Sequence, residues 1–326
     1  MNDHAGGDTN DLDRRQRAVV FAHRKLGVRC LKVLLAGGVD VALVVTHDDD
    51  PGGNNQDESV RSLCREERIP CTADDDAGSP ALLEQVRDAM PDLMFRFDYR
   101  HALPAELLAV APAYNMHCSL LPEFRGGAPV EWAVLHDATV TGASLHELTA
   151  EPGAGAIVSQ VEVPILPDDT AFDVAVKVTV AAEQTLWRVL PSLLDGTAPR
   201  LLGDAKAAAG PGVAADGGFG PRTPEDGRID WRQPARQVYN LHRAAAPPYP
   251  GAFTDIGGVR YVIERARLSG NFGNVVALGL PAGLTVVDNC IFGVCGDGRM
   301  LTISSLTADG APITAEQLQA RLRTRP

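Results

Sequence analysis

The chain has 326 residues, 45% of which are apolar, so it is long enough for one large or two ordinary globular domains. Its net charge of −12, with the acidic excess before Lys206, disfavours a nucleic-acid partner, and no apolar stretch is long enough to predict a membrane-spanning helix. The six cysteines form no C-x-x-C pair, so we expect reduced thiols in a cytoplasmic protein, without a disulfide or zinc framework.

The first half of the chain alternates short apolar runs with helical segments. Residues 1–17 are polar and are predicted to be a disordered tail. Strand-length apolar runs follow at 18–22, 39–47, 69–72 and 92–97, and helices are predicted over 27–37, 58–68 and 79–90. This alternation predicts an α/β fold with a doubly wound parallel sheet.

A fifth strand, "AYNMH", is predicted at 113–117. Ligands of doubly wound sheets bind beyond the carboxyl ends of the strands. We therefore expect the segments that follow three of these strands, 46–47, 99–101 and 113–129, to lie near one crevice. No G-x-G-x-x-G loop follows the first strand, so a dinucleotide site of that kind is not supported.

The second half of the chain has a different composition and a different pattern of predicted elements. A long helix is predicted over 171–195, and the Gly- and Ala-rich segment 203–220 is the best linker candidate. After it come a short helix at 233–244, a hairpin around Gly257 and Gly258, and several short strands. These signals predict four parts: a tail (1–17), an N-terminal domain (18–202), a linker (203–220) and a small β-barrel-like C-terminal domain (221–326).

Asn115 and His117 carry the clearest chemical signal. Side chains two residues apart on a strand point to the same face, so both are expected to face the crevice. An Asn amide donates a hydrogen bond to a developing oxyanion, and a His transfers protons near neutral pH. Together they suit acyl transfer to an amine, although an N-x-H pair judged alone is also compatible with a purely structural role.

The remaining aromatic and acidic residues have plainer interpretations. Trp132, Trp187 and Trp231 are interpreted as core anchors, and His136 and His146 as structural or surface residues, with a packing or pocket-wall role for His146. The aspartate runs at 48–50 and 72–78 are interpreted as solvated loops with weak metal potential. No metal site is predicted.

The flanks of the Asn–His pair add a family resemblance. "NMHCSLLPEFRGGAPVEWAVL", followed by "TGASLHELTAEPGAGAIVSQ", resembles the 10-formyltetrahydrofolate-dependent formyltransferases, whose pattern is N-x-H-x-S-L-L-P-x-x-R-G-x-x-P, T-G-x-x-x-H and D-x-G. "RTPEDGRIDWRQPARQVYNLHRAAAPPYPGAF" resembles that family's second domain. Within the family, "THDDDPG" and "RFDYRH" are most similar to the formyltransferase domain of a bifunctional polymyxin-resistance enzyme that formylates UDP-4-amino-4-deoxy-L-arabinose during lipid A modification. Its dehydrogenase half has no counterpart in this sequence.

The resemblance implies a Rossmann-like first domain, 10-formyltetrahydrofolate as cosubstrate and a small-molecule amine, of the nucleotide-sugar kind, as acceptor. Asn115 would stabilise the oxyanion, His117 would transfer protons, and Arg125 and Ser119 would contact the acceptor. The folate pocket would be lined by His101, Ala102, Leu103, Thr149, Ala150, Glu151, Pro152 and Gly153.

Two positions depart from the family pattern. The aspartate of D-x-G, which pairs with the catalytic His in the family, aligns with Gly153, and the residue after the R-G of the loop is Gly127 where the most similar relative has arginine. Glu151 is a possible substitute carboxylate. Three functions stay open: a sugar-nucleotide N-formyltransferase, altered or impaired by the missing aspartate; a non-catalytic folate- or sugar-nucleotide-binding homologue; and a methionyl-tRNA formyltransferase, which the acidic first domain disfavours.

Overall fold

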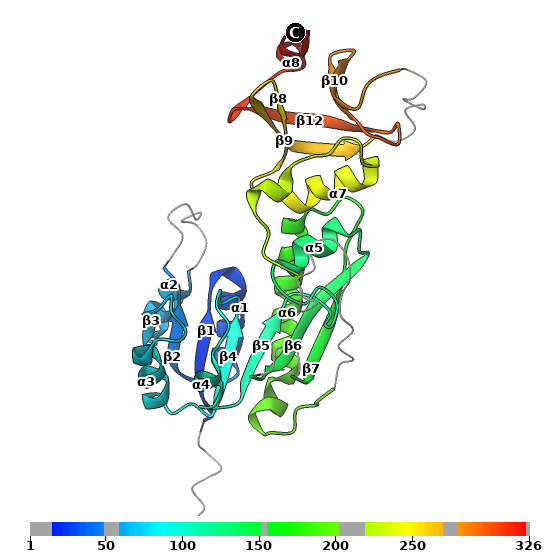
Figure 1. Cartoon of the computed structure of the whole chain (residues 1–326). Coiled ribbons are helices and arrows are strands. Elements are labelled where there is room, and N and C mark those ends of the chain that lie inside the picture. The colour runs from blue at the N-terminus through cyan, green and yellow to red at the C-terminus, as the bar shows by residue number, and fades with distance from the viewer. Residues whose placement is uncertain (1–14, 49–58, 151–154, 202–218, 270–278, 324–326) are drawn as a thin grey trace, which may run out of the picture. The chain divides into compact units, whose positions relative to one another are not determined.

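The computed structural model describes residues 15–48, 59–150, 155–201, 219–269 and 279–323 (Figure 1). The chain folds into two compact units. The first comprises the described parts of Met1–Pro122, Gly142–Val161 and Thr179–Lys206, and the second the described parts of Glu123–Thr141, Glu162–Val178 and Ala207–Pro326. Within the described ranges, no helix combines the length and the apolar character that crossing a membrane requires.

The main sheet has the strand order β3-β2-β1-β4-β5-β6-β7. Its strands are β1 (Arg17–Ala22), β2 (Asp40–Thr46), β3 (Cys71–Ala73), β4 (Leu93–Phe97), β5 (Ala113–His117), β6 (Val140–Leu148) and β7 (Ile157–Pro164). The first five strands pair in parallel, which confirms the predicted α/β class. The sheet then continues with β6, which runs antiparallel to β5.

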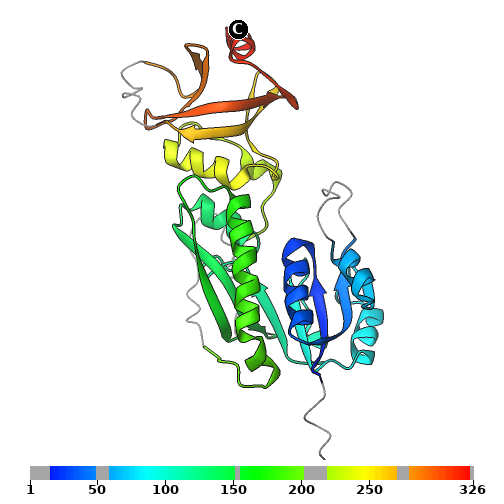
Figure 2. The same cartoon turned by 180° about the vertical axis from the view of Figure 1, so that it is seen from behind.

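Helices cover both faces of this sheet, which explains why residues 18–22 of the inner strand β1 are apolar. They are α1 (Arg24–Ala36), α2 (Val60–Glu67), α3 (Pro80–Asp88), α4 (Ala105–Leu108) and α6 (Ala171–Leu194). In Figure 2, α1 and α6 lie side by side over one face, where Arg29 Nη2 and Glu183 Oε2 are 2.5 Å apart. Residues 18–22 of β1 are 0% exposed, as expected for a parallel strand buried on both faces.

The second unit contains an antiparallel sheet in the order β10-β11-β12-β9-β8, with β13 paired to β12. Its strands are β8 (Ala252–Ile256), β9 (Val259–Leu268), β10 (Gly283–Val287), β11 (Cys290–Val294), β12 (Met300–Ala308) and β13 (Ala311–Pro312). Its helices are α5 (Pro129–Leu135), the short 3₁₀ helix η1 (Pro224–Gly227), α7 (Ala235–Ala245) and α8 (Ala315–Arg323). The pairing of β8 with β9 confirms the predicted hairpin around Gly257 and Gly258.

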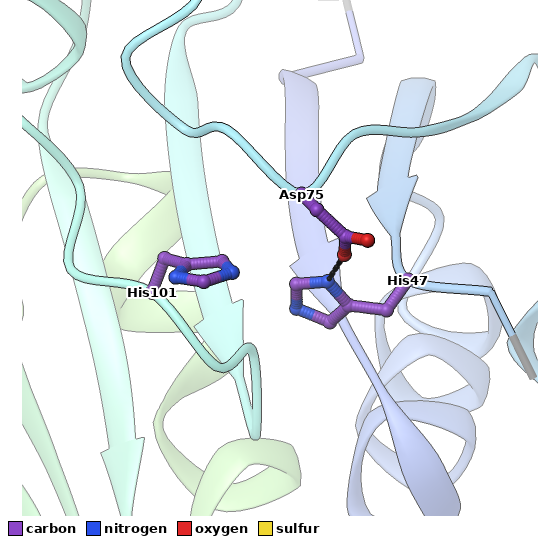
Figure 3. A group of neighbouring side chains, drawn as sticks. All are labelled: His47, Asp75 and His101. Atoms are coloured by element: carbon purple, nitrogen blue, oxygen red, sulfur yellow. Dashed lines mark hydrogen bonds and ion pairs between the residues drawn. The ribbon is translucent and has the colours of Figure 1, made fainter. Parts of the chain in front are cut away.

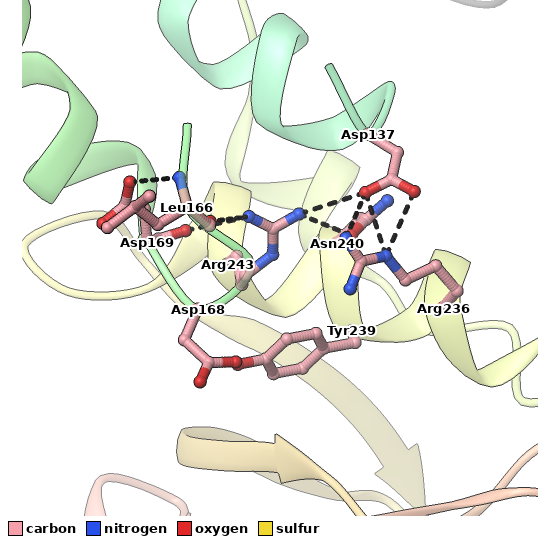
Figure 4. Close-up of polar contacts among 8 residues, drawn as sticks. All are labelled: Asp137, Leu166, Asp168, Asp169, Arg236, Tyr239, Asn240 and Arg243. Atoms are coloured by element: carbon pink, nitrogen blue, oxygen red, sulfur yellow. Dashed lines mark hydrogen bonds and ion pairs between the residues drawn. The ribbon is translucent and has the colours of Figure 1, made fainter. Parts of the chain in front are cut away.

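Arg243 of α7 organises a buried polar cluster in the second unit (Figure 4). The residue is 1% exposed, and its Nη1 donates to the Asp169 carbonyl at 3.1 Å while its Nη2 donates to Asn240 Oδ1 at 2.7 Å. Asp137 accepts from Arg236, and the hydroxyl of Tyr239 donates to Asp168 at 2.8 Å. The cluster therefore ties the segments around Asp137 and Asp169 to α7.

The three tryptophans do not share one role. Trp132 and Trp231 are 8% and 9% exposed, in agreement with the core prediction. The prediction for Trp187 is wrong, because this side chain is 57% exposed. It lies on the outer face of α6 and lines a surface pocket of about 780 Å³ together with Gly37 and Leu194. All six cysteines lie in described segments, and none of them forms a disulfide bond.

Candidate active site

The register of three strands brings Arg96, Asn115 and His146 side by side. On β5, Asn115 is paired with Arg96 of the parallel strand β4 and with His146 of the antiparallel strand β6. Arg96 Nη1 donates a hydrogen bond to Asn115 Oδ1 at 3.0 Å. Asn115 Nδ2 and His146 Nε2 are also 3.0 Å apart. The Asn115 side chain is thus held from both sides, and it is 5% exposed.

The chemistry of these neighbours fixes the orientation of the Asn115 amide. Arg96 only donates hydrogen bonds, so its partner must be the amide oxygen. His146 Nδ1 lies 2.8 Å from the Glu147 carbonyl, which only accepts, so Nδ1 carries the proton and Nε2 accepts from Asn115 Nδ2. Burial lowers the pKa of His146, which keeps the ring neutral in this role. The second N–H of Asn115 is used by neither contact.

His117 follows Asn115 by two residues on the same strand and is partly buried. Its ring lies 6.5 Å from the ring of His146, nearly perpendicular to it. Since His146 also contacts Asn115, the predicted shared face of Asn115 and His117 is confirmed. An amide donor and an imidazole therefore stand on one face at the carboxyl end of β5.

Arg96 also connects Asn115 to the loop after β4. Its Nη2 donates to the Tyr99 carbonyl at 2.7 Å, and its Nε donates to the His101 carbonyl at 3.0 Å. Burial lowers the pKa of Arg96, but a guanidinium group remains charged in proteins. The predicted proximity of residues 99–101 to the Asn–His stretch is confirmed by this one side chain.

His47, after β2, holds the other side of the same loop (Figure 3). Its Nε2 accepts from the backbone N–H of Arg100 at 3.1 Å, and its ring stacks on Tyr99 with centroids 4.3 Å apart. Its Nδ1 lies 2.7 Å from Asp75 Oδ1, and this hydrogen bond lowers the pKa of the Asp75 carboxyl. The Asp75 side chain is 74% exposed, in agreement with the predicted solvated loop at 72–78, but its pairing with the buried His47 was not predicted.

His47, Asp75 and His101 have the residue types and the spacing of a metal site, because their ligand atoms lie within 4.8 Å of one another. The hydrogen bonds do not fit that use. Nε2 of His47 accepts a backbone N–H, so the neutral ring carries its proton on Nδ1, which donates to Asp75. His47 therefore has no lone pair to offer a cation in this arrangement.

The other predicted site residues occupy different environments. His101 and Ala102 are exposed and Leu103 is buried, and Thr149 and Ala150 are exposed at the end of β6. The predictions for Glu151, Pro152 and Gly153 lie outside the described residues. Ser119 is 0% exposed and its carbonyl accepts from Ser144 Oγ at 2.6 Å, while Arg125 belongs to the second unit. Their contacts with folate or acceptor stay predictions.

Gly155, which we align with the glycine of the family's D-x-G, and Gly127, where we expected a departure from the family, both lie close to a neighbouring segment of the chain. Gly155 lies so close to β6 that an added Cβ would stand 1.9 Å from the Glu147 carbonyl oxygen. At Gly127, an added Cβ would meet the Pro221 nitrogen at 3.0 Å. The close neighbour of Gly126 and Gly127 in the R-G-G loop is the chain at 219–221.

Three contributors to the site have no catalytic role in the sequence predictions: Arg96 is not singled out there, His47 is only placed near the crevice, and His146 has a packing or pocket-wall role. Arg96 has a sequence signal, since it is the single charge in the apolar strand "LMFRF". His146 matches the H of T-G-x-x-x-H, but its contact with Asn115 depends on the pairing of β5 with β6. The contact agrees with the predicted packing or pocket-wall role of His146 and adds a partner, Asn115, that was not predicted.

An amide donor held beside an imidazole at the end of a parallel sheet is suited to acyl transfer. A family model described as formyl transferase matches residues 18–190, and one described as formyl transferase, C-terminal domain, matches residues 222–323. The first match alone spans more than half of the chain. The chain belongs to the formyl transferase family and is a formyltransferase.

Solved structures share the fold. The chain is 15% identical to an N-formyltransferase from Helicobacter canadensis, solved with folinic acid and dTDP-3-aminofucose, at a TM-score of 0.67 over 89% of this chain and 99% of that one. WlaRD, a sugar 3N-formyl transferase solved with dTDP and 5-N-formyl-THF, matches with a TM-score of 0.67 and 15% identity, over 89% and 97% of the two chains. A 4-N formyltransferase from Francisella tularensis matches with a TM-score of 0.56 and 19% identity, over 74% and 93%.

Proposed function

We propose that this formyltransferase moves the formyl group of 10-formyltetrahydrofolate to the amine of an amino-sugar nucleotide. The observation that carries the proposal is the orientation of the Asn115 amide, which leaves one N–H to donate beside His117. Similarity in fold to sugar N-formyltransferases solved with formylfolates and dTDP-linked ligands supports both substrate classes. The sequence resemblance favours a UDP-4-amino-4-deoxy-L-arabinose-like acceptor, as in lipid A modification.

In the proposed reaction, the neutral amine of the sugar attacks the formyl carbon and forms a tetrahedral intermediate. The second N–H of Asn115 donates to its oxyanion. His117 accepts the proton that the attacking nitrogen loses and delivers it to N10 of the folate as the carbon–N10 bond breaks. The products are the N-formyl sugar nucleotide and tetrahydrofolate, so atoms and protons balance.

In this proposal, the loop after β4 forms one side of the folate pocket. His101 and Ala102 are exposed there. Arg96 donates to the His101 carbonyl, and His47 accepts from the N–H of the preceding residue, Arg100. A rigid wall favours transfer because a pre-ordered pocket loses less entropy when the formyl donor binds.

A direct assay tests the proposal. The full chain is incubated with 10-formyltetrahydrofolate and, separately, with dTDP-3-aminofucose, UDP-4-amino-4-deoxy-L-arabinose and methionyl-tRNA. We expect a mass gain of one formyl group on at least one sugar nucleotide and none on the tRNA. Transfer to no amino sugar contradicts the proposal, and transfer to the tRNA alone favours the methionyl-tRNA alternative.

One observation favours a second candidate, a non-catalytic homologue that binds folate or a sugar nucleotide. By the sequence resemblance, Gly153 aligns with the aspartate of the family's D-x-G. In this case calorimetry detects binding of the same compounds, the wild type transfers no formyl group, and Gly153→Asp creates activity. If the wild type is active, Glu151→Gln tests the substitute carboxylate: a hundredfold or greater loss, in the range of about 10²–10⁴ for general acid–base catalysis, supports that role.

A further inference from the structure

We propose that Arg96 is a positioning residue for this transfer: its guanidinium group orients and polarises the Asn115 amide and holds that amide in fixed relation to the 99–101 loop. The inference rests on the proposed function for its kinetic consequences. Its structural part, the alignment of Asn115 and His146, is measurable without any turnover.

The surroundings of Arg96 make it an unusual place for a charge. Its neighbours on β4, Phe95 and Phe97, are 0% exposed, and a partly buried cation in an apolar strand has a desolvation cost. The acceptors of its three hydrogen bonds are all neutral oxygens: an amide oxygen and two backbone carbonyls. These contacts orient the positive charge without neutralising it.

The first consequence is polarisation of the amide. A cation that donates to an amide oxygen draws electron density away from the nitrogen, so the N–H groups become stronger donors. The Arg96–Asn115 bond is of this kind, and the remaining N–H is the proposed oxyanion donor. A stronger donor stabilises the transition state more than the ground state, because negative charge grows on the oxygen as the intermediate forms.

The second consequence concerns His146. The groups that act on its ring are the Arg96 guanidinium from β4, the His117 ring from β5 and the backbone carbonyl of Glu147 on its own strand. Burial and the charge of Arg96 both lower the pKa of His146, so the ring stays neutral and accepts from Asn115 Nδ2. Arg96 therefore acts on both ends of the Asn115 side chain.

The third consequence is mechanical. The planar guanidinium group bonds Asn115 Oδ1 and the carbonyls of Tyr99 and His101 at the same time. An arginine can do this with one rigid fork, whereas a lysine ammonium has no such geometry. The proposed folate wall and the oxyanion donor are thereby kept in register.

The test compares wild type, Arg96→Lys, Arg96→Met and a matched control, Arg87→Met, at an exposed arginine on α3. Activity is measured with 10-formyltetrahydrofolate and the amino-sugar nucleotides named above. We expect Arg96→Met to lower kcat by about ten- to a hundredfold, less than the loss of the donor itself, and to raise the KM for the folate several-fold. Arg96→Lys keeps the charge, so kcat recovers in part while the folate KM stays raised. Arg87→Met behaves as wild type.

Nuclear magnetic resonance supplies the independent measurement. In ¹⁵N-labelled wild type, His146 is expected to stay in the Nδ1–H form well below the ordinary histidine pKa. In Arg96→Met its pKa rises and the Asn115 side-chain amide resonances shift, whereas in Arg96→Lys the pKa of His146 stays close to that of wild type. Circular dichroism verifies the fold of each variant, and the lysine variant carries the test if the methionine variant does not fold.

The outcomes separate the two proposals. An inactive wild type whose His146 and Asn115 signals respond to Arg96 as expected contradicts the proposed function and retains the alignment by Arg96. Wild-type kinetics in both Arg96 variants, or a His146 titration in folded Arg96→Met that equals that of wild type, overturns the role of Arg96. If Arg96→Met does not fold, a wild-type folate KM together with unshifted Asn115 side-chain amide resonances in Arg96→Lys overturns it.

Discussion

Two arginine networks in this molecule look alike and differ in what they leave available. Arg243 in the second unit is 1% exposed, and its cluster includes carboxylates, among them Asp137 (Figure 4). Arg96 in the first unit is partly buried and bonds only neutral oxygens in the contacts described above. The first network closes on opposite charges and serves cohesion. The second directs a charge at an amide whose other N–H remains to donate, which is the arrangement expected of a working site.

The largest expected effect is on chemistry at Asn115. Asn115→Asp keeps the oxygen that Arg96 binds but removes the N–H donor and adds a negative charge beside the oxyanion. We expect kcat/KM for formyl transfer to fall at least about a hundred- to a thousandfold, the range for loss of one oxyanion donor. Steady-state assays measure this, and circular dichroism reports the fold. Undiminished transfer in a folded Asn115→Asp variant would exclude Asn115 as the donor.

The corresponding prediction for the second unit concerns Arg243, whose substitution is expected to lower stability. Arg243→Met leaves the Asp169 carbonyl and Asn240 without their buried donor, so the free energy of unfolding should fall by about 2–3 kcal/mol. The matched control is Arg236→Met, because this more exposed partner of Asp137 should contribute at most about 1 kcal/mol. Urea unfolding measures both. Equal losses in the two variants would mean that burial does not distinguish them.

The buried histidine of the second unit predicts a pH dependence. His242 Nε2 accepts from the Ala266 N–H at 3.2 Å, and burial lowers its pKa to about 4. Between about pH 6.5 and 4 the unfolded chain binds a proton that the native state does not, so the free energy of unfolding falls by about 3 kcal/mol as the pH drops through this range. Urea unfolding at several pH values should show a shallower slope for His242→Gln and the wild-type slope for His136→Gln. Identical slopes in all three would refute the assignment.

The smallest effect is expected at Asp75 in the first unit. Its bond to His47 lowers the native pKa of this carboxyl, so the stabilisation is present above its unfolded pKa of about 4 and is lost as the pH falls through the native value. Asp75→Asn should therefore lose less thermal stability than wild type on acidification from neutral pH to about 3. Melting curves at both pH values measure the difference. A larger loss in Asp75→Asn would contradict the described pairing.

Much of the fold is predictable from local patterns. Apolar runs separated by helical segments predict the five parallel strands, and "AYNMH" is a strand at the expected residues, 113–117. The core prediction for Trp187 is wrong because apolar character alone does not say which face of α6 a side chain occupies. The residue immediately before helix α5, Ala128, lies in the left-handed region at φ 50°, which no periodic pattern indicates.

The candidate site shows the same distinction between what local sequence predicts and what only the tertiary structure sets. The sequence by itself determined that Asn115 and His117 share a face, because side chains alternate along any strand. Only the tertiary structure decided that Arg96 and His146 hold Asn115, since strand pairing sets register between residues 19 and 31 positions away along the chain. Likewise, Gly127 is a departure in the sequence and acquires its reason when Pro221 is seen against it. Local periodicity encodes the direction of a side chain, whereas its partners depend on which strand packs beside it.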